Sequence, residues 1–382
     1  MEQIVKKIDN KYIVWFKHSN RWVKLEEPAW FINNLLQKGL NNKLTTKKFA
    51  DHYNLEIRQC SEFVEEICNK IKEAGKPCKN HNENIIAEDY KENFKFRKFS
   101  VRRYLIGGKQ FEIKYSTRLS EYYIHRPLAH MEVEDCSNEK VAEKYEIIDN
   151  ASIKVLRNIG DVSSSWAYKD FMWLKKRLYI NITNNIYNKS IHNWLSFVHA
   201  SAITNGQKTI LLSSPSGSGK STMAALLQIK GFKVVSDDFV PIDAKLKRAY
   251  PFPAAISVKK GAFSVLNSFY EILNNKNFDE ITKLTVRYIP TVDLSVSDLN
   301  ARPVKEIIFL RYDPNVECNF LKLSHIKALK LFHNQSWVSR ETEHARSFIN
   351  WFVKLRCFSL TYGDLEKGMD KISELFENRR ES

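Results

Sequence analysis

The stretch at residues 209–222, TILLSSPSGSGKST, decides the fold of this chain. Its first residues, TILL, favour a short β-strand, and the small residues at 213–219 let successive backbone N–H groups turn inward onto an anion. Residues 223–230, MAALLQIK, favour a helix whose positive N-terminal end points at the same anion. A strand, a phosphate-binding loop and a helix in this order predict a nucleotide-binding α/β core.

The side chains of this loop indicate which phosphates it binds. Lys220 would reach the β- and γ-phosphates of ATP, and Ser221 would offer its hydroxyl to Mg²⁺. The consensus loop begins with glycine, where this chain has a serine. A flexible Ser/Gly loop would explain the glycines but not the lysine. We therefore predict that the nucleotide is bound by Ser214, Ser216, Gly217, Ser218, Gly219, Lys220, Ser221 and Thr222.

Two carboxylates follow the next apolar segment, residues 232–238, FKVVSDD. Carboxyl ends of parallel strands meet at one edge of a sheet, so Asp237 and Asp238 should converge with the loop. One carboxylate can hold Mg²⁺ while the other accepts a hydroxyl proton. In the alternative interpretation, one of the two carboxylates is a remote Mg²⁺ ligand and the other is a surface loop residue. His199 precedes the strand of the loop and is either a core histidine or part of this site.

These three pieces, His199, SPSGSGKST and VVSDD, resemble the kinase core of bacterial HPr kinase/phosphorylase and its HPr-kinase-related relatives. The likeness extends over about residues 94–377 and includes YPFPAAISVKK at 250–260 and YGDL at 362–365. It implies an α/β P-loop kinase core.

The resemblance also implies a role for each site residue. The residue matching Asp237 is the catalytic base, and the residue matching His199 lies beside it and tunes it. Asp238 belongs with Ser221 to the metal side of the site. Lys220 neutralises the phosphates during transfer.

This chain departs from HPr kinase after the PFPAAIS segment, where that enzyme has a glutamate metal ligand and an Arg-Gly-rich motif. Lys259 and Lys260 stand there instead. The difference argues against the reverse phosphorylase reaction and for another substrate. Lys259 either contacts a phosphate or is a solvated loop residue, and Arg287 is a candidate contact to substrate or nucleotide.

The N-terminal part predicts a small winged-helix-like α+β domain over residues 1–77. Two strands rich in aromatic and β-branched residues, at 11–16 and 21–25, form a hairpin. Three short helices follow at residues 28–39, 46–52 and 61–74. The polar run at 78–94 is the predicted linker, and residues 95–382 are the predicted kinase domain.

The order of these N-terminal elements resembles PqqD-like domains, which recognise the leader segments of ribosomally made, post-translationally modified peptides. The resemblance implies that a precursor peptide binds as an added strand on a sheet edge. A DNA-binding winged helix and a structural cap are the alternatives. Glu62, Glu65, Glu66 and Glu73 on the third helix would repel phosphates, which disfavours DNA.

The net charge of +16 in 382 residues invites a nucleic-acid interpretation, but the basic residues are interleaved with acids and no nucleic-acid motif accompanies them. Two basic clusters are either solvated faces or surfaces that attract ATP or an acidic peptide: Lys95, Arg97, Lys98, Arg102 and Arg103, and Lys169, Lys175, Lys176 and Arg177. Six cysteines without CxxC spacing, no signal peptide and no long apolar run predict a cytoplasmic protein without integral membrane association.

Together these features predict an ATP- and Mg²⁺-dependent kinase that phosphorylates a hydroxyl, most simply a serine, of a precursor peptide. A kinase of HPr or of a free small molecule such as serine is one alternative. A nucleotide-gated peptide-binding escort without phosphotransfer is another. HPr-kinase relatives often assemble into oligomers, which leaves a homo-oligomer open.

Overall fold

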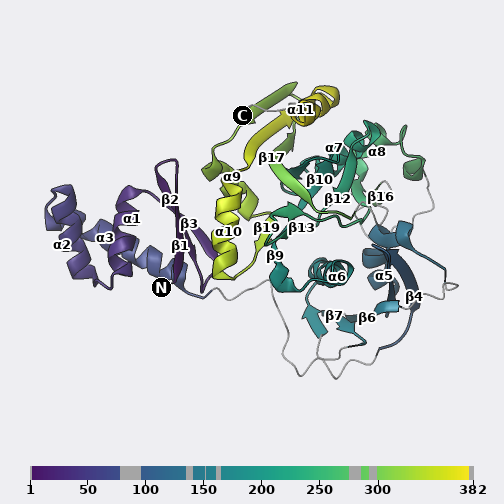
Figure 1. Ribbon diagram of the computed structural model, residues 1–382, viewed down its shortest axis with the longest axis horizontal. Coiled ribbons are helices and arrows are strands. Elements are labelled where there is room, and N and C mark those ends of the chain that lie inside the picture. The colour runs from purple at the N-terminus through teal and green to yellow at the C-terminus, as the bar shows by residue number, and fades with distance from the viewer. Residues whose placement is uncertain are drawn as a thin grey trace. The chain divides into compact units, whose positions relative to one another are not determined.

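The computed structural model describes residues 2–77, 96–134, 141–150, 152–160, 165–274, 285–291 and 299–377. It has a mixed α/β fold with several sheets (Figure 1). The chain divides into two compact units. The first contains Met1–Asn80, Ser324–Leu329 and Val338–Val353, and the second contains the rest. The predicted linker at 78–94 lies outside the described residues.

The first unit contains a three-stranded antiparallel sheet in the order β1-β2-β3. The predicted hairpin is confirmed, whereas the preceding strand β1 was not predicted, because only Ile4 and Ile8 of its residues are buried. Three helices follow the sheet, close to where the sequence placed them. The elements are β1 (Gln3–Ile8), β2 (Lys11–Phe16), β3 (Arg21–Leu25), α1 (Glu27–Gln37), α2 (Asn42–Tyr53) and α3 (Ile57–Gly75).

A segment far along the chain completes this unit. Helix α10 (Thr342–Phe352) contacts β1, and the rings of Phe348 and Trp22 lie 5.5 Å apart. Lys6 Nζ also donates a hydrogen bond to Asn350 Oδ1 at 3.0 Å. The sequence had assigned this helix to the domain at 95–382. Its apolar face instead packs against the N-terminal sheet, so residues 1–77 alone do not close the unit.

The second unit begins with a five-stranded sheet that the sequence analysis did not predict. Helices α5 and α6 contact it, and buried aromatic residues such as Tyr104, Phe111 and Tyr145 fill its core. The elements are β4 (Ser100–Ile106), β5 (Lys109–Tyr115), α5 (Arg118–His125), β6 (Val141–Asn150), β7 (Ile153–Asn158), β8 (Ser165–Tyr168) and α6 (Phe171–Ile186).

The larger sheet of this unit carries the segments that the sequence singled out. One part runs in the order β12-β10-β11-β17-β20-β18, and β14, β13 and β9 continue it from β17. Its strands are β9 (Trp194–Val198), β10 (Ala200–Thr204), β11 (Thr209–Ser213), β12 (Lys233–Ser236), β13 (Val240–Asp243), β14 (Arg248–Ala249), β17 (Arg302–Tyr312), β18 (Cys318–Lys322) and β20 (Arg356–Tyr362).

Strand directions bring these segments to one edge. β10 is antiparallel to both β11 and β12, so β11 and β12 run the same way with β10 between them. The loop after β11, the carboxylates after β12 and His199 just before β10 therefore lie at the same edge. The parallel direction of β11 and β12 agrees with the sequence-based expectation, but the antiparallel strand β10 between them has no signal in the sequence pattern.

Further elements surround this edge. Helix α7 follows the loop and contacts α11, and the two-stranded sheet β15-β16 packs against α7. Their bounds are α7 (Lys220–Ile229), β15 (Ile256–Lys259), α8 (Phe263–Leu266), β16 (Val286–Ile289) and α11 (Leu365–Glu377). The chain passes between the two units within α9 (His325–His333) and β19 (Ser336–Val338).

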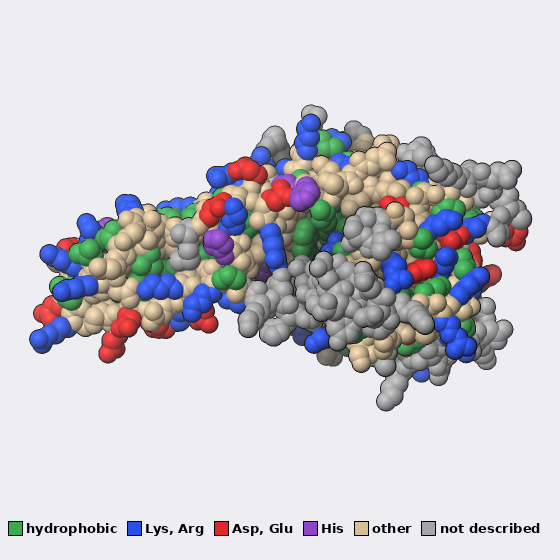
Figure 2. Space-filling view, turned by 90° about the horizontal axis from the view of Figure 1, so that it is seen from below, with side chains coloured by type: hydrophobic (Ala, Val, Ile, Leu, Met, Phe, Trp, Pro, Cys, Tyr) green, Lys and Arg blue, Asp and Glu red, His purple; other side chains and the backbone are tan. Residues whose placement is uncertain are grey.

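The distribution of charged side chains and the character of the helices are both relevant to the partners predicted from the sequence. Figure 2 shows Lys and Arg side chains interleaved with Asp and Glu over the visible face rather than gathered in one patch. In the described part of the chain, no helix combines the length and the apolar character that crossing a bilayer requires.

Candidate functional site

The glycine-rich loop, residues 214–219, ends where α7 begins. Gly217 and Gly219 have φ angles of 89° and 94°, the left-handed region that favours glycine. A Cβ on Gly219 would lie 2.5 Å from the hydroxyl of Tyr362, which adds a steric requirement. The loop conformation therefore depends on glycine at both positions.

Lys220 folds back over this loop. Its Nζ donates hydrogen bonds to the carbonyl oxygens of Ser214 at 2.8 Å and Pro215 at 3.4 Å, and the residue is only 5% exposed. Burial lowers the pKa of Lys220, while the charges of Asp238 and Asp237 oppose that shift. Lys220 is thus a buried cation at the start of a helix. An anion bound there would interact with the ammonium group and with the backbone N–H groups of the first helical turn.

The remaining loop residues lie around the same point. Lys259 Nζ donates to Ser216 Oγ at 2.7 Å, and the carbonyl oxygen of Ser218 accepts a hydrogen bond from the backbone of Tyr312 at 3.2 Å. The Ser218 hydroxyl is buried without a hydrogen-bond partner among the described residues. Gly217, Gly219, Ser221 and Thr222 line the adjacent cavity.

Asp237 is buried at the end of β12 and is 2% exposed. It accepts hydrogen bonds from the hydroxyl of Ser201 at 2.5 Å, from that of Ser221 at 3.0 Å and from the backbone N–H of Ser257 at 3.1 Å. Burial, followed by the charge of Asp238, raises the pKa of Asp237 to about 6. The structure therefore joins Asp237 to Ser221.

Asp238 has a different environment. It turns out of the strand with a φ of 62°, and its side chain is 36% exposed. Its Oδ1 accepts a hydrogen bond from His199 Nε2 at 3.0 Å, and its Oδ2 accepts one from Ser257 Oγ at 3.0 Å. Burial alone would raise the pKa of Asp238, but the hydrogen bond and charge of His199, with Lys175 and Lys220, lower it below its usual value.

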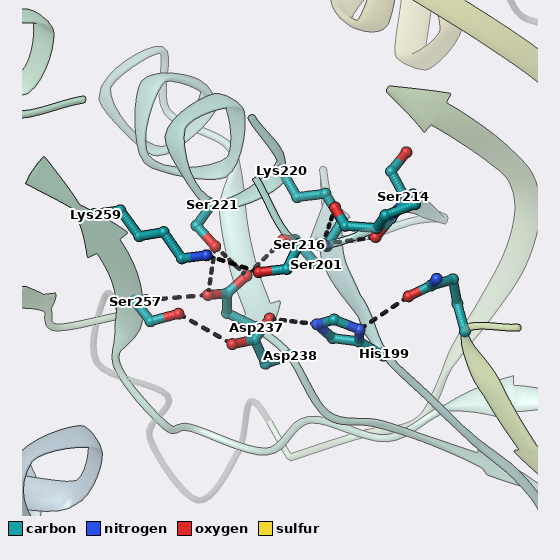
Figure 3. A network of polar contacts seen from close by, with 12 residues as sticks. His199, Ser201, Ser214, Ser216, Lys220, Ser221, Asp237, Asp238, Ser257 and Lys259 are labelled. Carbon is teal, nitrogen blue, oxygen red and sulfur yellow. Dashed lines mark hydrogen bonds and ion pairs between the residues drawn. The ribbon is translucent and has the colours of Figure 1, made fainter. Parts of the chain in front are cut away.

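His199 is held from its other side. Its Nδ1 lies 3.0 Å from Gln335 Oε1, and its backbone N–H donates to the carbonyl oxygen of Gln335 at 2.7 Å. This fixes the ring so that Nε2 faces Asp238 (Figure 3).

These contacts pair the residues differently from the sequence-based expectation. The resemblance to HPr-kinase relatives predicts His199 beside Asp237 and Ser221 with Asp238, whereas in the structure His199 pairs with Asp238 and Ser221 with Asp237. Successive side chains at a strand end point to opposite sides, and Asp238 has a left-handed backbone with a φ of 62°, so the two carboxylates point in different directions. Spacing along the chain cannot tell which of two adjacent carboxylates faces which partner.

A cavity of about 530 Å³ opens at this site. Lys220, Asp238 and Lys259 supply charged groups to its lining, and Tyr312 and Leu365 supply apolar surface. Tyr312 is 49% exposed, and its ring lies edge-on to that of Tyr362 with centroids 5.8 Å apart. The cavity is within the size range of small-ligand sites and offers both a charged and an aromatic wall.

The two candidate substrate residues have different positions. Lys259 lines the cavity, as Figure 3 shows for its contact with Ser216. Arg287 pairs with Val258 across β15 and β16, and Val258 points into the core. The guanidinium of Arg287 lies 4.5 Å from the ring of Phe263, on the face opposite to Lys259. The structure brings Lys259 to the loop and does not bring Arg287 there.

Sequence reasoning missed several residues of the site. Ser201 follows His199 by two positions on β10, so period-2 alternation could have placed it on the same face. Ser257 lies in the quoted ISVK segment and could have been noticed. Gln335 comes from a distant part of the chain and gave no signal.

The oxygen donors of the site fit Mg²⁺. The Ser221 hydroxyl and the Asp237 carboxylate are hard ligands, and Mg²⁺ is commonly held by one or two such groups together with substrate phosphates. Within the described ranges, no group of three or more His, Cys, Asp or Glu side chains could form a metal site. The arrangement suits a cation that is shared with a nucleotide.

The comparisons with known proteins do not identify a family. No family model matches this chain, and the search of curated proteins found no match. The resemblance to HPr-kinase relatives and to PqqD-like domains therefore stays a prediction from the sequence.

Proposed function

We propose that this protein is an ATP- and Mg²⁺-dependent kinase that transfers the γ-phosphoryl group to an alcohol hydroxyl. The observation that carries the proposal is the convergence of three arrangements at one edge of the sheet. These are the buried Lys220 in its glycine-rich loop, the Ser221–Asp237 pair and the His199–Asp238 pair. Phosphoryl transfer requires little more than positioning, charge neutralisation and a proton acceptor.

The loop and two lysines would bind the triphosphate. Lys220 would exchange its contacts with the loop carbonyl oxygens for contacts with the β- and γ-phosphates. Lys259, close to Ser216, would add a second cation. The exposed ring of Tyr312 on the cavity wall would pack against the nucleobase.

Ser221 and Asp237 would hold Mg²⁺. This assignment follows the observed contact and replaces the grouping of Ser221 with Asp238 that the sequence suggested. When bound, the ion supplies positive charge that neutralises the phosphate oxygens. Ser201 and the backbone of Ser257 keep the Asp237 carboxylate in place.

Asp238 would accept the proton of the attacking hydroxyl. Its carboxylate lines the cavity beside the glycine-rich loop, so a hydroxyl group that enters the cavity can reach it. The hydroxyl oxygen forms a bond to the γ-phosphorus as the bond from that phosphorus to the bridging oxygen breaks. The electron pair of the broken bond leaves with ADP, and the proton passes to Asp238. His199 orients this carboxylate.

A precursor peptide with a leader segment is the acceptor that we propose. In the order β1-β2-β3, each outer strand has one edge that no described strand pairs, and an extended leader segment can add to such an edge. Free serine, another small molecule and HPr are alternative acceptors. A nucleotide-gated escort is disfavoured because a switch needs no proton acceptor beside the phosphates.

The product nucleotide tests this function. Full-length protein is incubated with ATP, Mg²⁺ and serine-containing peptides, and nucleotide products and peptide masses are measured. ADP together with phosphopeptide is expected. AMP would indicate adenylation, and ATP binding without ADP or AMP would indicate an escort; either result contradicts the proposal.

A further inference from the structure

Helix α6 places two lysines next to the turn that carries Asp238. The ring of Tyr179 on α6 packs against Phe239 with centroids 5.6 Å apart, and Phe239 directly follows Asp238. Lys175 and Lys176 precede Tyr179 by four and three positions, so they share its face of the helix. This face covers the Asp238 turn.

Neither lysine forms an ion pair with any residue that the structure describes, although the charges of Asp238 and Asp170 act on Lys176. Lys175 Nζ lies 5.9 Å from the ring centroid of Tyr179, and Lys176 Nζ lies 4.4 Å from that of Trp173. Both residues are half-buried, and among the described residues no carboxylate lies within ion-pair distance of either. The comparably buried Lys154, by contrast, pairs with Asp149 at 2.7 Å.

Burial makes this arrangement costly. Burial, followed by the charge of Lys175, lowers the pKa of Lys176. The charges of Asp238 and Asp170 oppose this shift, but neither carboxylate forms an ion pair with Lys176. Two neighbouring ammonium groups that are partly removed from water would be stabilised further by an external anion.

The hydroxyl of Tyr288 also lies near Asp238 and near Tyr179 of α6. Tyr288 pairs directly with Ser257 across β15 and β16, so their side chains share one face of this small sheet. The Ser257 hydroxyl on that face donates to Asp238. Burial raises the pKa of Tyr288, which therefore keeps its proton and can donate it in a hydrogen bond. The Tyr179 hydroxyl nearby is also buried, and no described group is within hydrogen-bond reach of it.

The nucleotide does not account for these residues. Lys220 and Lys259 line the cavity beside the glycine-rich loop, but Lys175 and Lys176 are not part of that lining. Asp238 is subject to the charges of both Lys175 and Lys220. It therefore has one cation on the loop, Lys220, and another on α6, Lys175.

We propose that Lys175, Lys176 and Tyr288 bind an anionic group, a carboxylate or a phosphate, that the acceptor carries next to the hydroxyl to be phosphorylated. This inference rests on the proposed kinase function and specifies its substrate class. The anion would be held on the α6 side of Asp238. The two lysines would offset its repulsion by the Asp238 carboxylate.

The test uses full-length protein and three capped peptides that differ only beside the serine. They are acetyl-Gly-Ser-Gly-amide, acetyl-Gly-Ser-Asp-amide and acetyl-Gly-Ser-phosphoserine-amide. Initial rates of ADP release give kcat/KM for each peptide. Analogues with alanine in place of the acceptor serine give Kd by calorimetry in the presence of MgADP. The aspartate and phosphoserine arms distinguish the two sources of negative charge.

We expect the wild-type protein to prefer at least one anionic peptide by about tenfold or more in kcat/KM. The double variant Lys175→Gln/Lys176→Gln should lose this preference and bind the anionic analogue about tenfold more weakly. Its KM for ATP should stay within about twofold, because the two lysines do not line the cavity that would hold the nucleotide. Lys175→Arg/Lys176→Arg should retain the preference.

The matched control Lys245→Gln/Lys305→Gln removes the same charge from exposed positions of the same unit. An equal loss in this control would assign the effect to net charge and overturn the proposal, as would an unchanged preference in the Lys175/Lys176 variant. If no peptide yields ADP while the anionic analogue still binds through the two lysines, the kinase function fails and the anion site stands. If the peptides are phosphorylated without any preference for negative charge, the kinase function stands and the anion site is excluded.

Discussion

His199 Nε2 and Asp238 Oδ1 lie 3.0 Å apart, whereas Asp237 faces Ser221. This relationship separates two adjacent carboxylates into two environments. Asp237 is enclosed by hydroxyl and amide donors, and Asp238 is open to the cavity. Groups of the same chemical type can then have different roles.

We predict that Asp238→Asn lowers kcat by a factor on the order of 10² to 10⁴ and leaves the affinity for ATP within a few-fold, because it removes the proton acceptor alone. Asp237→Asn should instead raise the Mg²⁺ concentration that gives half-maximal rate. Kinetics at varied Mg²⁺ and ATP measure both effects. If the Asp237 variant loses kcat at saturating Mg²⁺ and the Asp238 variant is nearly normal, the roles are those first inferred from the sequence.

We predict that Lys220→Ala abolishes turnover and weakens ATP binding, because it removes the buried cation at the start of α7. Lys305→Ala, at an exposed position, is the control. Nucleotide binding by calorimetry and ADP release report the two effects separately. Normal turnover in the Lys220 variant would exclude the glycine-rich loop as the phosphate site.

We predict that Tyr312→Ala raises the KM for ATP roughly tenfold with little change in kcat, because it removes the exposed aromatic wall of the cavity. Tyr312→Phe keeps the ring and should behave like the wild type. Steady-state kinetics at saturating acceptor measure this difference. Equal KM values in the alanine variant and the wild type would place the nucleobase elsewhere.

The raised pKa of Asp237, about 6, predicts how Mg²⁺ stabilisation depends on pH. A carboxyl group whose pKa is higher in the folded than in the unfolded state stabilises the metal-free protein when it is protonated. This contribution is complete at pH values below the pKa of aspartate in the unfolded chain, about 3.9, and is lost as the pH rises through about 6. Mg²⁺ competes with the proton, so its shift of the melting temperature should be larger at about pH 7.5 than at about pH 5. Asp237→Asn should remove the pH-dependent part. A Mg²⁺ shift that is equal at both pH values in the wild type would contradict the metal site.

We predict that Phe348→Ala lowers the free energy of unfolding by about 3 kcal/mol or more, because the ring is 1% exposed and packs on Trp22. Glu343→Ala changes an exposed residue on the same helix and should have little effect. Thermal or urea unfolding, with Trp fluorescence as the probe, compares the two. Similar stabilities would mean that α10 contributes little to the first unit.

Much of the fold could be predicted from local sequence patterns. The hairpin at β2 and β3, the loop before α7 and the strands β17 and β20 each have a short apolar or glycine-spaced signature. Asp364 is a favoured helix-capping residue, and its Oδ1 accepts a hydrogen bond from the backbone N–H of Lys367 at 3.0 Å. These features depend on neighbours in the chain.

The parts that could not be predicted depend on distant neighbours. The antiparallel strand β10 between β11 and β12 follows from the pairing of whole strands, and the contact of Gln335 with His199 joins residues 136 positions apart. Which carboxylate faces Ser221 depends on the left-handed backbone at Asp238. The packing of α10 on β1 likewise has no local signal, because an amphipathic helix does not specify which sheet it covers.

The contribution of α10 to the first unit limits how this protein could exchange domains during evolution. A recombination event that replaced only Met1–Asn80 would leave α10 facing a foreign sheet, with Phe348 and Asn350 separated from Trp22 and Lys6. A viable hybrid gene would have to carry Val338–Val353 as well, at a distant site in the coding sequence. The two units should therefore be inherited together, and specificity should change by point substitution rather than by module replacement.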